Sequence, residues 1–249
     1  MAHFEFELFK QAVEDANNIV VFVGAGLSTD SGVPDFRSPN GIWTKYKPVY
    51  FSDFITSEAA RKRYWKMKIE SFELYQHAQP NDGHKWIYSL EQRNKLLGLI
   101  TQNVDGLHRV VGHSSDKFIE IHGTDREVAC LDCNNRLNAA PFYEDKSSAD
   151  VPPRCKLCNG FLKPATISFG QSMDKYSMLK ARQWTLAADL FIVIGSSLQV
   201  QPAASFPVIA QSNQVPLAII NRESTPYDHL ADYLFHCEIK ELTAVLFSQ

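Results

Sequence analysis

The chain has 249 residues, 45% of them hydrophobic, so it can bury a large core as one domain with an insertion or as two unequal domains. Its formal net charge of -3 gives no overall basic field, and we expect no direct binding to nucleic acid. The N-terminal residues lack the basic segment and apolar core of a secretory signal, and no apolar run reaches the roughly 18 residues of a membrane span. We therefore expect a cytoplasmic protein with no membrane partner.

The chain begins with a predicted helix and a predicted strand. Apolar residues in 4–17 recur at helical spacing, which predicts a helix that packs through Phe4, Leu8 and Ala12. Residues 18–23 form an unbroken apolar, β-branched run, typical of a strand that is buried on both faces of a parallel sheet. A ligand-binding loop is expected after such a strand.

The next segments are predicted to be helical. Residues 52–77 carry apolar residues at helical spacing and predict a small helical module. After a turn at 80–83, a second helix is expected from His84 to Leu90, with Trp86 and Ile87 in the core.

Four further apolar runs predict strands, and each ends in a small or polar cluster. They are 96–101, followed by Gln102-Asn103-Val104-Asp105; 117–121, followed by His122-Gly123; 190–194, followed by Gly195-Ser196-Ser197; and 216–220, followed by Asn221-Arg222. Ligands of an open α/β sheet lie beyond the carboxyl ends of its strands, so these clusters should meet in one crevice.

The loop after the first strand carries a G-x-G turn. Gly24 and Gly26 allow close backbone approach, and we expect Ser28, Thr29 and Asp30 to cap a short helix whose N–H groups could hold a pyrophosphate. This motif alone is compatible with a plain tight turn.

The same loop departs from a dehydrogenase fingerprint. Thr29 stands at the third glycine position, and Pro34 stops the helix within a few residues. In place of a long helix the chain offers Asp35, Phe36 and Arg37, which are an acid, an aromatic face and a permanent cation, although a solvated loop is the alternative.

Four of the five cysteines form two C-x-x-C pairs: Cys130 with Cys133, and Cys155 with Cys158. Two such pairs complete a tetrahedral Zn²⁺ site, and four thiolates leave no open position for water, so we predict one structural zinc. Disulfides or free thiols are the alternative, and Cys237 stands apart.

These motifs together resemble the sirtuin family of NAD-dependent protein lysine deacylases. The matching segments are Gly24-Ala25-Gly26-Leu27-Ser28, Pro34-Asp35-Phe36-Arg37, Gln102-Asn103-Val104-Asp105, His122-Gly123, the four paired cysteines, Gly195-Ser196-Ser197-Leu198 and Asn221. The resemblance implies a Rossmann-like domain of residues 1–36, 80–125 and 165–249, and a small domain made of a helical module (37–79) and a zinc ribbon (126–164). It also implies transfer of the acyl group to ADP-ribose, with release of nicotinamide. Nicotinamide should also inhibit the enzyme.

The resemblance assigns roles by position. His122 would be the general base, and Asn103 and Asp105 would act on the nicotinamide group with Val104. The remaining NAD contacts would be Gly24, Ala25, Gly26, Ser28, Thr29, Asp35, Phe36, Arg37, Gln102, Gly195, Ser196, Ser197, Asn221, Arg222, Cys237 and Glu238. The acyl-lysine peptide would lie as an added strand between Ile167, Phe169, Gly170 and Gln171 on one side and Leu198, Gln199 and Val200 on the other. The other seven histidines are interpreted as surface or packing residues, with His108 the first exception to consider.

Two departures from the family pattern bear on the substrate. Gln171 replaces the glutamate of most relatives, and Lys68 and Ser71 stand near the positions of the tyrosine and arginine that select acidic acyl groups. We therefore expect neutral acyl groups. Two other functions remain open from the sequence: a mono-ADP-ribosyltransferase or NAD hydrolase, and a non-catalytic NAD-sensing module.

Overall fold

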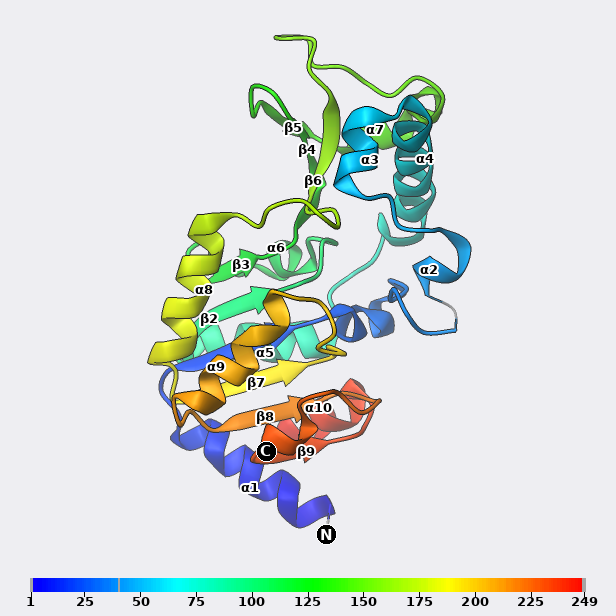
Figure 1. Ribbon diagram of the computed structural model, residues 1–249. Helices are drawn as coiled ribbons and strands as arrows, with labels where there is room; N and C mark the ends of the chain where they lie inside the picture. The colour runs from blue at the N-terminus through cyan, green and yellow to red at the C-terminus, as the bar shows by residue number, and fades with distance from the viewer. Residues whose placement is uncertain (1, 40, 248–249) are drawn as a thin grey trace.

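The large sheet of this protein is six-stranded and wholly parallel (Figure 1). The structure, a computed structural model, describes residues 2–39 and 41–247. The strand order is β3-β2-β1-β7-β8-β9. The strands are β1 (Ile19–Val23), β2 (Leu96–Thr101), β3 (Phe118–Glu120), β7 (Leu190–Ile194), β8 (Leu217–Ile220) and β9 (Tyr233–Phe235).

Five of these strands are the predicted ones, and β9 is the strand that the sequence analysis missed. β9 is three residues long and only its Phe235 is buried, so it lacks the longer buried run by which β1, β2, β7 and β8 were found. It pairs with β8 and extends the sheet at its edge.

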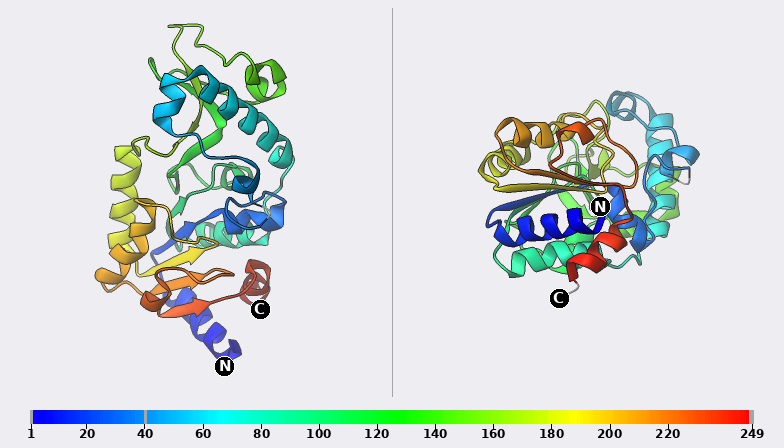
Figure 2. Two further views of the ribbon diagram at one scale, coloured as in Figure 1. Left: turned by 45° about the vertical axis from the view of Figure 1, so that its right-hand side comes forward. Right: turned by 90° about the horizontal axis from the view of Figure 1, so that it is seen from below.

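Helices cover both faces of this sheet because the side chains of a strand alternate. Ile19, Val21 and Val23 face the helices α1 (Ala2–Asp15), α5 (Asp82–Gln92) and α10 (Ile239–Phe247), whereas Val20 and Phe22 face α8 (Lys175–Ala187) and α9 (Phe206–Ser212). Figure 2 (right) shows the sheet between these two layers. Trp86 and Ile87 of α5 are buried as predicted.

The predicted packing face of the first helix is right for Ala12, which packs against the core, but wrong for Phe4 and Leu8. Phe4 and Leu8 are 69% and 47% exposed, whereas Phe9 and Val13 are buried against the sheet. The helix presents two apolar stripes, and the one that reaches the core continues through Phe9, Val13 and Ala16 to the start of β1.

A second, smaller body lies above the large sheet in Figure 1. Its antiparallel sheet has the order β5-β4-β6, with β4 (Gly123–Cys130), β5 (Arg136–Asn138) and β6 (Leu162–Thr166). Packed with it are α3 (Phe51–Thr56), α4 (Glu58–Tyr75), α7 (Ala140–Glu144) and the short 3-10 helix η2 (Lys146–Ala149), as Figure 2 (left) also shows. The helix predicted over 52–77 is therefore two helices, because Ser57 is extended and its side chain caps α4 by accepting the N–H of Ala60.

The connections carry short helical turns. These are η1 (Ala25–Ser31), α2 (Ile42–Lys45), α6 (Leu107–Val111), η3 (Ala203–Ser205) and η4 (Asp228–Leu230). Within the described ranges, none of the helices has both the length and the apolar character needed to cross a membrane.

Candidate active site

A cleft of about 380 Å³ lies where the polar clusters after the strands meet the smaller body. Most of the predicted site residues line it. Those that do are Gly24, Ala25, Gly26, Ser28, Thr29, Asp35, Phe36, Arg37, Gln102, Asn103, Val104, Asp105, His122, Ile167, Phe169, Gly170, Gln171, Gly195, Ser196, Ser197, Val200, Asn221, Arg222, Cys237 and Glu238.

The glycine turns after β1 and β7 pack directly on one another. The N–H of Gly26 donates to the carbonyl oxygen of Gly195 at 2.9 Å. A Cβ at Gly24 would lie 2.6 Å from that oxygen, and a Cβ at Gly195, which has φ +63°, would lie 2.4 Å from the nitrogen of Leu27. Glycine is therefore required here by the close approach of two backbones.

The helix after Gly24 differs from the predicted one. It is the 3-10 helix η1, and it begins at Ala25, so Ser28, Thr29 and Asp30 lie inside it and do not cap it. The Thr29 hydroxyl instead donates to the carbonyl oxygen of Gly26 at 2.9 Å. The helix ends at Ser31, and Gly32 caps it in the left-handed conformation.

Buried hydrogen bonds join the loop after β2 to the loop after β1. The Ser28 hydroxyl donates to Asp105 Oδ2 at 2.7 Å, and Asn103 Nδ2 donates to Ser28 Oγ at 3.0 Å. Gln102 Nε2 donates to Ser196 Oγ at 2.7 Å, which brings in the loop after β7. Burial raises the pKa of Asp105, and hydrogen bonds from Leu107 and Ser28 oppose that shift. The polar ends of three strands thus form one fixed network.

His122 is held at the junction of the two bodies. It directly precedes β4, and its carbonyl oxygen accepts the N–H of Ile167 at 2.7 Å. Burial lowers the pKa of His122 below its usual value, and a hydrogen bond with the backbone of Gln102 opposes the shift. The imidazole is therefore neutral at pH 7 and able to accept a proton.

The segment from Ile167 to Gln171 continues the edge strand β6 into the cleft. The N–H of Ser168 donates to Gln171 Oε1 at 3.1 Å, so the Gln171 side chain orders its own loop. In the part of the chain that the structure describes, β6 pairs with β4 on one side and with no strand on the other. Main-chain groups there are suited to an added strand.

Leu198 and Gln199 do not line the cleft, unlike the other predicted peptide contacts. The Leu198 side chain is 2% exposed and belongs to the core on the α8 and α9 face of the sheet. Its φ of +53° turns the chain, so Val200 reaches the cleft where Leu198 does not.

Polar and charged side chains gather at the end of the cleft beside β8. Asn221 Nδ2 donates to the carbonyl oxygen of Glu223 at 2.7 Å, and a guanidinium nitrogen of Arg222 lies 3.8 Å from Glu238 Oε1. Arg222 here and Arg37 in the loop after β1 both line the cleft. A dinucleotide with an anionic diphosphate fits this donor set and the glycine turns.

The sequence analysis missed several residues of the cleft. Asp125 and Tyr75 line the cleft together with Lys68. The Asp125 carboxylate accepts hydrogen bonds from both Lys68 and Tyr75. Trp43 also lines it, and its ring lies 5.6 Å from those of both Phe36 and Phe169. Lys68 and Ser71, which were predicted to stand near the positions that select the acyl group, both line the cleft.

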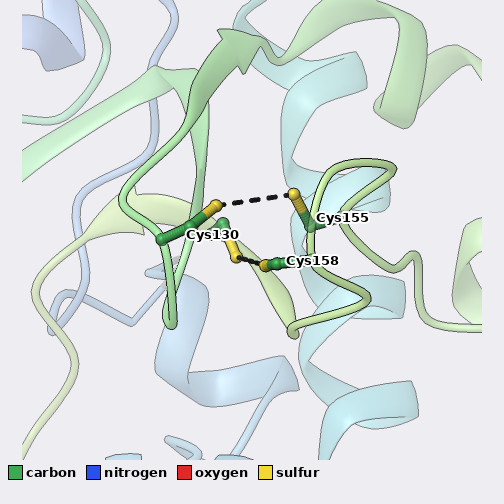
Figure 3. Close-up of side chains that lie close together, drawn as sticks. Cys130, Cys155 and Cys158 are labelled. Atoms are coloured by element: carbon green, nitrogen blue, oxygen red, sulfur yellow. Dashed lines mark hydrogen bonds between the residues drawn. The ribbon is translucent and has the colours of Figure 1, made fainter.

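The four paired cysteines come together as predicted. Cys130 Sγ lies 3.4 Å from Cys158 Sγ, Cys133 Sγ lies 3.7 Å from Cys155 Sγ, and all four sulfur atoms lie within 4.8 Å of one another. Figure 3 shows Cys130, Cys155 and Cys158 with their sulfur atoms directed into one space. Tetrahedral zinc with bonds of about 2.3 Å places its sulfur ligands about 3.8 Å apart, so these residues fit a zinc ion.

The chain was compared with protein-family models, curated proteins and solved structures. The model described as the Sir2 family matches residues 24–202. An NAD-dependent protein deacetylase of Thermodesulfovibrio yellowstonii is 40% identical over 93% of this chain and 88% of its own length. An NAD-dependent protein deacylase of Aquifex aeolicus is 38% identical over 88% of this chain and 89% of its own length.

Solved structures agree with the sequence matches. A Sir2 complex with a deacetylated p53 peptide and 3'-O-acetyl ADP-ribose has a TM-score of 0.88 at 32% identity, covering 97% of this chain and 96% of that one. A complex of Sir2 with a p53 peptide and NAD⁺ has a TM-score of 0.85 at 30% identity, covering 96% and 95%. The glycine turns, the network around Asn103, the buried His122 and the four cysteines therefore stand in a chain that belongs to the Sir2 family.

Proposed function

We propose that this chain is an NAD-dependent protein lysine deacylase that converts an acyl-lysine, NAD and water into lysine, nicotinamide and O-acyl-ADP-ribose. The observation that carries the proposal is that His122 shares one cleft with both the glycine turns and the segment after β6. Membership of the Sir2 family and the activity given to the relatives support it. The zinc is structural, because its four ligands are all cysteines.

Each group of residues has a role in this proposal. NAD supplies the ADP-ribosyl group that takes up the acyl oxygen, and nicotinamide leaves from it. Arg37 and Arg222 hold the diphosphate and the adenosine end, whereas Asn103 and Asp105 orient the nicotinamide carboxamide. The network around Ser28 keeps these side chains in place before the ligand arrives, which lowers the cost of binding.

His122 takes the proton in this scheme. Its imidazole is neutral at pH 7, and it accepts a proton from the ribose hydroxyls as they attack the acyl carbon. The N–H of Ile167 is used by the carbonyl of His122, which leaves the carbonyl oxygen of Ile167 to accept the N–H of the acyl-lysine. Phe169 lines the channel for the acyl-lysine side chain. Nicotinamide inhibits the reaction by rebinding in its own pocket.

The test uses purified protein with NAD and an acetyl-lysine peptide, and follows nicotinamide and deacetylated peptide together by mass spectrometry. Equal appearance of both supports the deacylase. His122→Ala should abolish deacetylation and leave NAD binding nearly unchanged, whereas His77→Ala, at an exposed histidine, should keep full activity.

Two other results would overturn the proposal. Nicotinamide without deacetylated peptide identifies an ADP-ribosyltransferase or NAD hydrolase. Silence in both channels, with NAD still bound, identifies a non-catalytic NAD-sensing module.

A further inference from the structure

A buried ion pair forms part of the wall of the cleft. Lys68 Nζ lies 2.8 Å from both carboxylate oxygens of Asp125, and the two side chains are 11% and 3% exposed. Both residues line the cleft. The pair therefore faces any group that fills this part of the cleft.

The Asp125 carboxylate has a full set of donors. It accepts the hydroxyl of Tyr75 at 3.0 Å and that of Tyr143 at 3.2 Å, in addition to Lys68. The Lys68 ammonium has three N–H donors, and both of the bonds found for it among the described residues end on Asp125. An N–H of Lys68 is left for an acceptor in the cleft.

Tyr64 lies near both the pair and the segment that is proposed to hold the reacting amide. The Tyr64 hydroxyl is 2.9 Å from Thr166 Oγ1, in the residue before Ile167, and the Tyr64 ring centroid is 5.7 Å from Lys68 Nζ. Ile167, Tyr64 and Lys68 all line the cleft, so an acyl-lysine whose amide is held at Ile167 shares that cleft with Lys68.

A second buried cation, Lys163, lies close to the pair without lining the cleft, and its Nζ is 5.2 Å from the Tyr64 ring centroid. Lys163 is 1% exposed, does not line the cleft, and donates to the carbonyl oxygens of Pro164 and Thr166. An acyl carboxylate that approached Lys68 would also approach the Asp125 carboxylate, whose charge repels it. A purely apolar chain would cover the Lys68 N–H without replacing its bond to water.

We propose that the Lys68–Asp125 pair selects short acyl groups that carry a neutral hydrogen-bonding group, such as a hydroxyl, beyond the amide. This inference rests on the proposed deacylase function and names its substrate class. The hydroxyl oxygen accepts from Lys68, and no net charge is buried with it.

The test compares one peptide sequence carrying acetyl-, butyryl-, 3-hydroxybutyryl- or succinyl-lysine, with kcat/KM measured for each. 3-Hydroxybutyryl should exceed both butyryl and succinyl by about tenfold, which corresponds to about 1.4 kcal/mol. In Lys68→Met/Asp125→Leu the ratio of 3-hydroxybutyryl to butyryl should fall to about one. Lys62→Met, at a partly exposed lysine that pairs with Glu58 on the same helix, should keep the ratio of the unchanged protein.

The outcomes separate this proposal from the function on which it rests. Equal values for butyryl and 3-hydroxybutyryl, a preference for succinyl, or a preference that survives the double variant would each overturn the selection by the pair. Failure to deacetylate the acetyl peptide would overturn the deacylase itself. Should the double variant not fold, Lys68→Met alone removes the donor while Tyr75 and Tyr143 still bond Asp125, and the ratio must fall there too.

Discussion

Lowering the pH from 7 to 5 should destabilise the protein through a cluster of buried histidines under the large sheet. His84, His108 and His113 are 0%, 2% and 6% exposed, and their ring centroids lie 5.0 Å (His84 to His108) and 5.5 Å (His108 to His113) apart. In the described part of the chain, His84 Nε2, both nitrogens of His108 and His113 Nε2 have no hydrogen-bond partner. His113 Nδ1 contacts Glu91 at 2.6 Å.

The direction of the pH effect on stability follows from the burial of the histidine rings. Burial lowers the pKa of His84 from 6.5 to about 3, and it lowers those of His108 and His113 in the same direction, with Glu91 opposing the shift at His113. The unfolded chain takes up these protons below pH 6.5, but folded His84 stays neutral until about pH 3. Stability is therefore full above pH 6.5 and is lost as the pH falls toward 3.

The loss of unfolding free energy between pH 7 and pH 5 depends little on how far burial lowers the pKa of His84. At pH 5 an unfolded histidine lies about 1.5 pH units below its pKa, and each unit is worth about 1.4 kcal/mol. The loss is thus about 2 kcal/mol for His84, and the lowered pKa of His108 adds a loss of the same sign.

The assay is urea unfolding followed by tryptophan fluorescence at pH 7 and pH 5. His84→Gln should reduce the loss of unfolding free energy between the two pH values by about 2 kcal/mol, because glutamine does not titrate. His77→Gln, at an exposed histidine, should leave that loss unchanged. Acid release of zinc affects every variant alike, so a loss in His84→Gln as large as in the unchanged protein would refute the reasoning.

Two further predictions concern stability. Cys155→Ser, or zinc removal by a chelator, should lower the melting temperature and abolish deacylation. The reason is that Cys155 belongs to the core that joins the cysteine loops to α4 and α7. An unaltered melting curve after the metal has left would contradict this prediction. Phe9→Ala should cost about 3 to 5 kcal/mol of unfolding free energy, whereas Phe4→Ala should change it by less than about 0.5 kcal/mol; equal costs in urea unfolding would restore the packing face first predicted.

The sheet was predictable where a strand is buried on both faces. The runs that became β1, β2, β7 and β8 are apolar without a break, and their position in a parallel sheet follows from that pattern alone. β9 escaped because its apolar run covers only Tyr233–Phe235, whereas the segment predicted as a strand around β3 covers 117–121. The face of α1 was misjudged because two stripes of similar apolar character compete, and only the packed sheet chooses between them.

Residues of the site could be predicted from the sequence where polar side chains directly follow the end of a predicted strand. Asn103, His122 and Ser196 were found in this way, and the cysteines by their spacing. The bond between Lys68 and Asp125 could not be found, because it joins residues of α4 and β4 that lie 57 apart in the chain. The histidine cluster was hidden for the same reason, since no local pattern marks a ring that will be buried.

The place of β1 in the strand order sets the timing of folding during synthesis. β1 pairs with β2 on one side and with β7 on the other, and β7 ends at Ile194, 171 residues after β1 ends at Val23. At ribosomal rates of about 5 to 20 residues per second, one edge of the buried strand β1 stays open for roughly 9 to 34 s. An N-terminal fragment that stops before β7 should consequently aggregate, and the nascent chain depends on chaperones until that strand emerges.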